Sequence, residues 1–296
     1  MPSASRRLLA DERGQSLAFV LTTLLALMLI VAVGINVGQA MTRRMLLQML
    51  ADAGAFTGAT VMAQGMNTIA DQNLRIQRAW ALTSEATLAF TTPPCIASDL
   101  AVSAYGTVQR TVSELIRRVN SGYGELAAAE AREVTRYNAI DLFPGERLTM
   151  REFDFESGIV PQRPGGRLVD LEEVPSGTAP AVSSPTPGFS TKTWSCLQGP
   201  AVLPRSASFG LWFQNASSDP IQFVWVVKAP RTRARFFDQL FGSFSIPEMT
   251  AAAVAKPIGG DIRRGRTDYV AKMTALRKVT GQVFDAVFRK IRPVHH

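Results

Sequence analysis

The sequence has almost no histidine, and this removes most of the common catalytic and metal-binding devices. Its two histidines, His295 and His296, stand at the extreme C-terminus. A Ser-His-Asp or Cys-His arrangement therefore lacks an internal base, and His/Cys zinc spacings are absent. Phosphate-binding GxxxxGK[ST], dinucleotide-binding GxGxxG and nucleophile-elbow GxSxG motifs are also missing. We predict no enzyme, no cofactor and no metal site. Catalysis by carboxylates alone is the remaining enzymatic alternative.

Cysteine is scarce as well. Cys95 and Cys196 are the two cysteines, about 100 residues apart, and neither belongs to a CxxC motif. If this part of the chain is exported, its compartment is oxidising and a single disulfide between them is expected. Closing so long a loop would stabilise the fold by about 4–5 kcal/mol in the chain-entropy model. The alternative is two buried thiols.

Charge is absent from one long stretch, and the rest of the chain is organised around it. No charged residue lies between Arg13 and Arg43, and Gln15–Ala40 is almost entirely apolar. As a helix, this uncharged stretch is roughly 43 Å long, whereas a bilayer core needs about 20 residues. We predict a transmembrane helix at residues 15–42. The alternatives are a buried core helix of a soluble protein and a signal peptide cleaved after Ala40.

Arginines on the two sides of the span predict its orientation. Arg6, Arg7 and Arg13 precede it, and Arg43 and Arg44 follow it. The positive-inside rule therefore favours a cytoplasmic tail at residues 1–14 and an extracytoplasmic C-terminal part. The net charge of +8 favours anionic lipid or an acidic partner. Nucleic acid is not an expected partner, because the basic residues are spread along the chain without a recognition motif.

Residues 43–92 are predicted to continue the span as a stalk helix, because proline first interrupts them at Pro93. A stripe of mostly small residues recurs along it at alternating steps of four and three. The stripe consists of Leu47, Ala51, Gly54, Gly58, Val61 and Gly65. Gly34 and Gly38 form a similar pair inside the span, where Asn36 could hydrogen-bond to another helix. Such residues let helix backbones approach closely, so we expect a packing interface either with a partner's helix or with the chain's own domain.

Two motifs flank the span, Asp11–Gln15 (DERGQ) and Leu47–Ala55 (LQMLADAGA). Together with the single apolar helix, they resemble the N-terminal module of TadE/TadG-like proteins of tight-adherence (Flp) pilus-assembly systems. The resemblance covers a fifth of the chain. It implies a bacterial inner-membrane protein with one span, a periplasmic domain and a role in assembling or anchoring a pilus or secretion apparatus.

The same resemblance bears on processing. Gly14 is where prepilin-type cleavage would occur, although Phe19 replaces the glutamate that prepilin-like members carry five positions later. Many larger TadG-like proteins also have a von Willebrand A domain with an Asp-x-Ser-x-Ser metal motif. This chain has no such motif, so metal-dependent adhesion is not carried over.

Residues 93–296 are predicted to form a periplasmic α+β domain in which an antiparallel sheet packs with helices. The expected helices are Ala101–Asn120 and Gly124–Ile140, broken at Ser121-Gly122, then Thr250–Ala255 and an amphipathic C-terminal helix at Thr267–Ile291. The expected strands are Leu148–Phe155, Arg167–Val174, Ser190–Cys196, Ala207–Gln214 and Ile221–Lys228, with a hairpin turn at Asn215–Pro220 between the last two.

The sequence thus favours a structural protein of a Tad-like pilus or secretion system, inserted in a bacterial inner membrane and contacting other membrane proteins through its long helix. It leaves the oligomeric state open. A secreted, soluble binding protein released after Ala40 and a membrane-anchored periplasmic enzyme are the alternatives.

Overall fold

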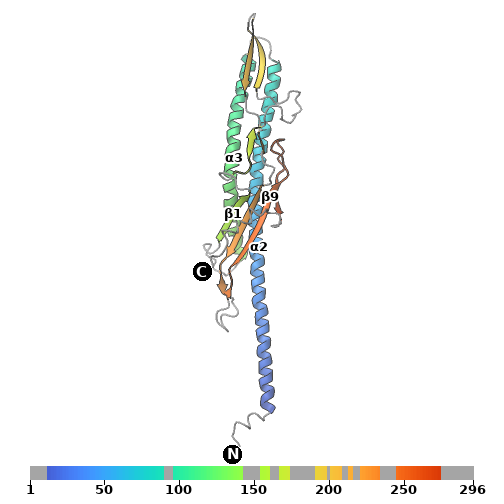
Figure 1. Ribbon diagram of the computed structural model, residues 1–296, viewed down its shortest axis with the longest axis vertical. Helices are drawn as coiled ribbons and strands as arrows, with labels where there is room; N and C mark the ends of the chain where they lie inside the picture. The colour runs from blue at the N-terminus through green and yellow to red at the C-terminus, as the bar shows by residue number, and fades with distance from the viewer. Residues whose placement is uncertain are drawn as a thin grey trace, which may run out of the picture. The chain divides into compact units, whose positions relative to one another are not determined.

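A computed structural model describes residues 12–89, 96–142, 154–160, 167–173, 191–198, 201–208, 213–215, 221–233 and 245–274. Two long helices dominate, α2 (Glu12–Ala89) and α3 (Ile96–Leu142), and Figure 1 draws them beside each other. The strands are β1 (Asp154–Val160), β2 (Leu171–Glu173), β3 (Thr191–Gln198), β4 (Ala201–Ser208), β5 (Phe213–Asn215), β6 (Gln222–Ala229), β7 (Thr232–Arg233), β8 (Ser245–Ile246), β9 (Met249–Ile258) and β10 (Val270–Thr274).

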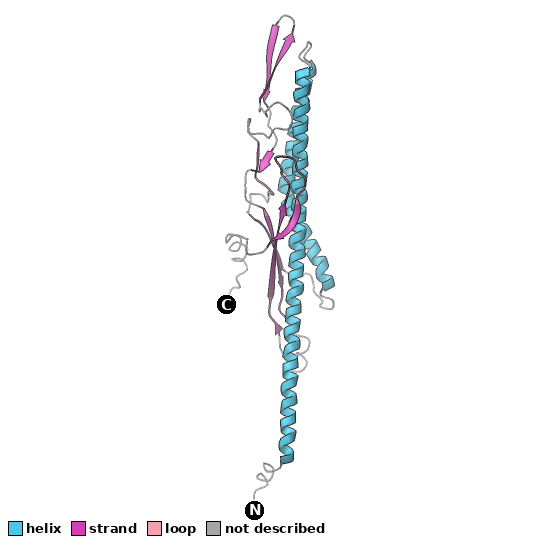
Figure 2. Cartoon of the chain, turned by 90° about the vertical axis from the view of Figure 1, so that its right-hand side faces the viewer, coloured by secondary structure: helices cyan, strands magenta, loops and turns pink. Residues whose placement is uncertain are grey.

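The strands form one larger sheet and three ribbons (Figure 2). The sheet has the order β1-β6-β9-β10, and β10 pairs antiparallel with β9 from Val270↔Ile258 to Thr274↔Val254. The ribbons β2-β5, β3-β4 and β7-β8 are also antiparallel. The predicted α+β class with antiparallel strands is therefore confirmed.

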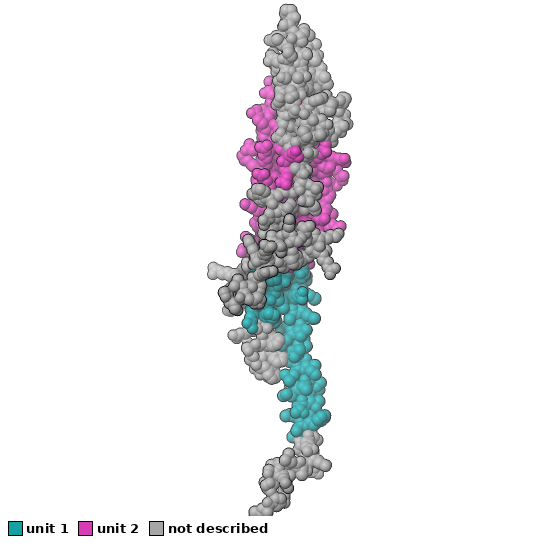
Figure 3. All heavy atoms as spheres, viewed as in Figure 1, with its two compact units in different colours: residues 1–49, 147–154, 227–251 teal, residues 50–146, 155–226, 252–296 magenta. Residues whose placement is uncertain are grey.

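The chain divides into two compact units, coloured separately in Figure 3. The first contains residues 1–49, 147–154 and 227–251, and the second contains residues 50–146, 155–226 and 252–296. The helix α2 contributes Glu12–Met49 to the first unit and Leu50–Ala89 to the second, without interruption. The predicted continuation of the apolar segment into a long stalk helix is confirmed.

In the first unit, α2 carries the apolar segment. Of the helices that the structure describes, α2 is the one long and apolar enough to cross a membrane, and 6% of its most apolar stretch is buried. Large apolar side chains from Leu17 to Val37 are exposed along it. Thr22 and Thr23 donate their hydroxyls to carbonyls of the preceding turn at 2.8–2.9 Å. Both hydroxyls are therefore satisfied within the helix, as an apolar environment requires.

In the second unit, α2 and α3 form an antiparallel pair. Gly54 of α2 faces Thr135 of α3, Gly65 faces Tyr123 farther along, and Trp80 contacts Tyr105 farther still. In these contacts the residue numbers increase along α2 and decrease along α3, so the two helices run in opposite directions. Strand β6 packs against the same stretch of α2, and its burial is nearly complete, as predicted for Ile221–Lys228.

The predicted break at Ser121-Gly122 is wrong, because α3 runs unbroken through both residues. One glycine costs a helix about 1 kcal/mol relative to alanine, which packing on each side of it can offset. Ser121 also donates its hydroxyl to the carbonyl of Arg118 at 3.1 Å, so it is satisfied inside the helix.

The two predicted helices near the C-terminus are also wrong where the structure describes them. Thr250–Ala255 lies in β9, and Val270–Thr274, at the start of the expected amphipathic helix, is β10. Alanine favours a helix in isolation, but β9 lies between β6 and β10 in the sheet, where Ala253, Val254 and Ala255 are buried, and this overrides the preference. The remainder of the predicted helix, residues 275–291, lies outside the described residues.

The strands between these regions were predicted less accurately. Ser190–Cys196 matches β3, but the Ala207–Gln214 strand is replaced by two separate strands, β4 and β5. The predicted hairpin joining the latter to β6 is wrong, since β5 pairs with β2 and β6 lies between β1 and β9. Strand β4 contains Pro204, a residue that is rare inside strands. The proline is accommodated there because each strand of a two-stranded ribbon is an edge strand.

Candidate functional site

The glycines of the predicted stripe form notches on α2 that aromatic residues of β6 occupy. A Cβ added at Gly54 would lie 2.3 Å from Trp225 Cδ1, and one at Gly58 would lie 2.2 Å from Phe223 Cε1. Four residues of helix and two residues of strand rise by similar distances, about 6.0 and 6.6 Å. The GxxxG spacing on α2 therefore matches the alternate positions 223 and 225 on β6. Their rings stack with centroids 6.0 Å apart.

The rest of the predicted stripe is buried too. Leu47, Ala51, Val61 and Gly65 are buried, and a Cβ at Gly65 would lie 2.7 Å from both Tyr123 and Leu168. The sequence left two alternatives for this stripe, packing on a partner's helix or on the chain's own domain. Gly54, Gly58 and Gly65 pack on the chain's own domain. Strand β6, helix α3 and the segment around Leu168 fill the space that another protein's helix would need.

Gly34 and Gly38, the other predicted packing pair, lie in a different setting. A Cβ at either glycine would have nothing within 4 Å, so this face of α2 is open. Asn36, two residues from each, is 4% exposed and its Oδ1 has no hydrogen-bond partner. The open face of the apolar segment is thus opposite the side on which Asn36 is buried.

Three asparagines on the helices each hold one residue of a non-helical segment by both its main-chain groups. Asn73 accepts the N–H of Phe213 at 2.7 Å and donates to its carbonyl at 2.9 Å. Asn120 does the same to Val169 at 2.9 Å for both bonds, and Asn67 to Tyr269 at 2.9 and 3.0 Å. A side-chain amide presents a donor and an acceptor like a strand edge. We call these three contacts asparagine brackets.

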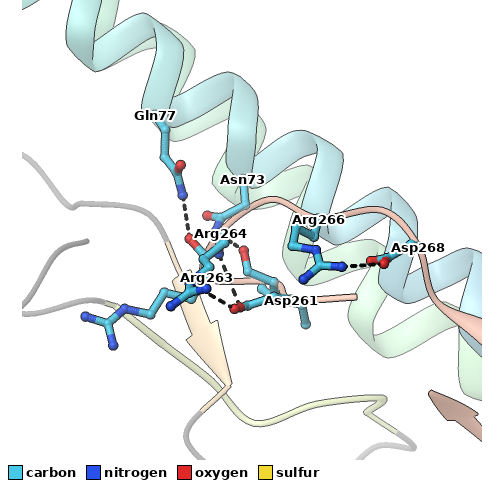
Figure 4. A network of polar contacts seen from close by, with 8 residues as sticks. Asn73, Gln77, Asp261, Arg263, Arg264, Arg266 and Asp268 are labelled. Atoms are coloured by element: carbon cyan, nitrogen blue, oxygen red, sulfur yellow. Dashed lines mark hydrogen bonds and ion pairs between the residues drawn. The ribbon is translucent and has the colours of Figure 1, made fainter. Parts of the chain in front are cut away.

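Asn73 makes one bond more, and it secures a tight turn against α2 (Figure 4). Its Nδ2 donates to the carbonyl of Ile262 at 2.6 Å, and Gln77 donates to the carbonyl of Arg263 at 2.7 Å. The turn is closed by paired main-chain bonds between Asp261 and Arg266. Gly265, just before Arg266, has φ of 65°, and a Cβ there would lie 2.7 Å from the Cβ of Leu74. Glycine is therefore needed both for conformation and for close approach.

The rim of this turn carries ion pairs that water can reach. Arg264 pairs with Asp261 at 3.6 Å and Arg266 with Asp268 at 2.7 Å, all with exposed side chains. The hydrogen bond from Arg266 holds the pKa of Asp268 below its ordinary value. Exposed pairs of this kind contribute little to stability, so the buried amide contacts of Asn73 and Gln77 do more to hold the turn.

A charged residue at the end of the apolar segment is turned inward. Arg43 is 5% exposed, and its guanidinium donates to the carbonyl of Pro230 at 3.2 Å. Its neighbour Arg44 is exposed. Both arginines were used to predict orientation, and one of them also ties α2 to the segment after β6 within the first unit.

The aromatic pair Trp80 and Tyr105 joins α2 and α3 at their far ends, edge to face with centroids 5.1 Å apart. Tyr105 is 2% exposed, and burial raises the pKa of its hydroxyl above the ordinary value of 10.0. As the pH rises, the hydroxyl of Tyr105 therefore loses its proton at a lower pH in the unfolded chain than in the folded chain. Stability from this group is complete below pH 10 and is lost as the pH rises above it.

We expect Tyr105→Phe to remove part of the alkaline destabilisation. Above about pH 10, the wild-type free energy of unfolding should fall more steeply than that of the variant, by about 1.4 kcal/mol per pH unit. The measurement is chemical denaturation of the full chain in mild detergent between pH 9 and 11.5. Because Tyr269 titrates in both proteins, it cancels in the difference. Parallel pH profiles would contradict a buried, neutral Tyr105.

A groove of about 460 Å³ lies between α2 and α3, lined by Phe56, Thr57, Thr60, Val61, Gln64, Tyr123, Leu126 and Glu130. It contains one carboxylate and no histidine. Within the described residues, no three His, Cys, Asp or Glu side chains come together in a way that could hold a metal ion.

The structure describes some of the remaining predicted site residues but not all of them. Cys95 lies outside the described residues, and Cys196 lies in β3, opposite Leu203, so the disulfide stays a prediction. Gly14 lies in the first turn of α2.

The sequence analysis did not predict the asparagine brackets. Their signal in the sequence is an asparagine on the apolar face of a helix, where it must find buried partners.

Comparisons of the chain with protein-family models, with curated proteins and with solved structures found no match.

Proposed function

We propose that this chain is a single-span membrane protein with a structural role, assembling or anchoring a pilus or secretion apparatus like those served by TadE/TadG-like proteins. The observation that carries the proposal is the division of one helix into two halves. From Leu17 to Val37, α2 exposes large apolar side chains, and from Leu47 onward its stripe is buried under the chain's own sheet and second helix. Such a helix suits an anchor that is also part of the fold.

Several features support an anchor over a discarded signal peptide. The helix runs without a break through Gly38-Gln39-Ala40, where a signal peptidase site would lie. Three residues later, Arg43 is buried against Pro230, so cleavage would leave the new terminus close to a packed contact. Arg6, Arg7 and Arg13 support the proposed orientation, with the N-terminus in the cytoplasm and the α+β domain in the periplasm of a bacterial inner membrane.

The resemblance to TadE/TadG-like proteins gives the proposal its biological setting. Of the LQMLADAGA motif, Leu47, Ala51 and Gly54 face the inside of the fold. The motif therefore has a packing role in this chain, which fits a structural protein.

The first test is the mature N-terminus in the native host. Intact mass should be measured separately for the membrane fraction and for the soluble fraction. We expect a carbonate-resistant membrane protein that begins at or near Met1. A membrane form beginning at Gln15 would instead indicate prepilin-type processing and a minor-pilin role. A soluble form beginning at Met41 would overturn the proposal.

The second test concerns the machine. We expect deletion of the gene in the native host to abolish surface filaments or secretion by a Tad-like system, with restoration by the intact gene. Filaments are counted by electron microscopy. Unchanged filaments and unchanged secretion would refute the assembly role while leaving the membrane anchor intact.

A further inference from the structure

Basic residues are concentrated in the part of the first unit that follows the apolar segment. By sequence, residues 43–49, 147–154 and 227–251 contain eight Lys and Arg against four Asp and Glu. The much longer second unit contains 21 Lys and Arg against 18 Asp and Glu. The basic residues of the first set are Arg43, Arg44, Arg147, Arg151, Lys228, Arg231, Arg233 and Arg235, and the acidic ones are Glu152, Asp154, Asp238 and Glu248. Half of the chain's net charge of +8 therefore belongs to the unit that also contains the apolar segment.

One hydrogen bond brings two of these arginines to the same level along α2. The guanidinium of Arg43 donates to the carbonyl of Pro230 at 3.2 Å, so the segment that continues into Arg231 lies beside the first charged residue after the apolar segment. Arg44 follows Arg43 directly. Arg44 and Arg231 are both exposed, whereas Arg43 is buried. Two exposed guanidinium groups from distant parts of the chain therefore lie at the end of the apolar segment.

With the proposed span, this level is the headgroup layer of the bilayer. As a helix, residues 15–42 are about 42 Å long, which matches the roughly 40–45 Å of a bilayer with its headgroups. Arg44 begins about 3 Å beyond Thr42 along the helix axis. Arginine side chains near the end of a span extend toward lipid headgroups, and a guanidinium can bind a phosphate through two parallel hydrogen bonds. Arg44 and Arg231 are therefore at the depth where lipid phosphates lie.

The charge that folding brings to this level does not oppose the proposed orientation. The positive-inside rule counts basic residues within about 15–20 residues of the end of a span along the chain. Arg43 and Arg44 are within this distance, but Pro230 and its neighbour Arg231 are not, since Pro230 lies 187 residues after Arg43. Folding therefore adds positive charge beside the membrane without changing the signal that sets the orientation.

We propose that Arg44 and Arg231 bind the phosphate of an anionic phospholipid in the leaflet next to the α+β domain. The bond from Arg43 to Pro230 holds the segment of Arg231 beside α2, so both arginines are in place before a lipid binds. A zwitterionic lipid has a cation of its own next to its phosphate, and the basic first unit therefore favours a lipid with net negative charge. This inference rests on the proposed membrane span.

The test is lipid binding by the full chain, purified and delipidated in mild detergent and measured by native mass spectrometry. We expect the wild type to bind phosphatidylglycerol at least tenfold more tightly than phosphatidylcholine with the same acyl chains. The double variant Arg44→Gln/Arg231→Gln should bind the two lipids equally. The matched control, Arg110→Gln/Arg118→Gln, removes two exposed arginines of α3 and should keep the tenfold preference, because the net charge of the protein changes by the same amount.

Several results would overturn the proposal. They are a wild type without lipid preference, a preference that survives Arg44→Gln/Arg231→Gln, and equal losses in the two double variants. Displacement of phosphatidylglycerol by an equal concentration of inorganic phosphate would also overturn it, because the arginines would then bind a free anion. Carbonate extraction of native membranes tests the span separately. A chain that is extracted would refute the span itself, whereas a membrane-bound chain without lipid preference would refute only the headgroup site.

Discussion

Replacing Gly58 with leucine should lower the free energy of unfolding by about 3 kcal/mol or more, because overpacking a buried contact costs 1–3 kcal/mol even for small insertions. The first added carbon would already lie 2.2 Å from Cε1 of Phe223. That ring is fully buried and stacked on Trp225, so it has no free direction in which to move. The measurement is urea denaturation of the full chain in mild detergent.

Gly122 provides the matched control. It lies in the middle of α3, and a Cβ there would have nothing within 4 Å. Gly122→Leu should therefore stabilise the protein slightly, by about 0.5–1 kcal/mol, because leucine is the better helix former. If leucine lowers the free energy of unfolding at Gly58 and raises it at Gly122, the result would establish that Phe223 occupies the notch at Gly58. Equal effects at both positions would show that Phe223 does not occupy it.

The same experiment decides how partner binding can be interpreted. If Gly54→Leu or Gly58→Leu abolished co-purification with membrane partners, the loss would follow from a disrupted helix–sheet contact. It would not show that a partner binds at these glycines. A substitution at an exposed position of α2, such as Met45, would avoid this difficulty.

The second large effect is expected at Asn73. Asn73→Leu keeps the approximate volume but leaves the N–H and carbonyl of Phe213 and the carbonyl of Ile262 without their partner. Each buried group left unsatisfied costs about 1–3 kcal/mol, and with partial rescue by water we expect a loss of about 3–5 kcal/mol. The loss should appear as a lower denaturation midpoint and as faster proteolysis of the 261–266 turn.

Asn73→Asp separates hydrogen bonding from packing. The carboxylate can still accept from Phe213 but faces two carbonyl oxygens, so its pKa is raised in the folded state. Stability of this variant should therefore be best below about pH 4 and fall as the pH rises through that raised pKa. Asn138→Asp is the control. Its side chain is half-buried and makes no hydrogen bond within the described part of the chain, so the change in the free energy of unfolding for Asn138→Asp should stay within about 0.5 kcal/mol. Similar losses at both positions would contradict the bracket.

The sequence was informative where one local property decides the outcome. Absence of charge and proline predicted the long helix, and the apolar run at 221–228 predicted a central strand. The spacing of Gly54 and Gly58 predicted close approach, but not that Trp225 and Phe223 would be the approaching residues. That information lies about 170 residues away in the chain, and the GxxxG pattern is the same for a helix or a strand partner.

The errors came from positions where long-range contacts outweigh local preference. Alanine-rich Thr250–Ala255 is a good isolated helix, yet it is a strand because it lies in β9, between β6 and β10 in the sheet. Gly122 suggested a break, yet packing along α2 carries α3 through it. The brackets of Asn67, Asn73 and Asn120 were invisible because their partners are main-chain groups, which any residue type supplies.

The unbroken course of α2 between Gly38 and Met41 fixes the side of the helix on which Arg43 and Leu47 lie relative to Asn36. Each residue inserted there would turn Arg43 and Leu47 by about 100° relative to Asn36, away from the side on which all three are buried. Three or four residues would restore the phase to within about 60°, and seven to within about 20°. Length changes in this segment therefore keep Asn36, Arg43 and Leu47 on one side of α2 only in steps near whole helical turns, so the segment acts as a fixed angular spacer.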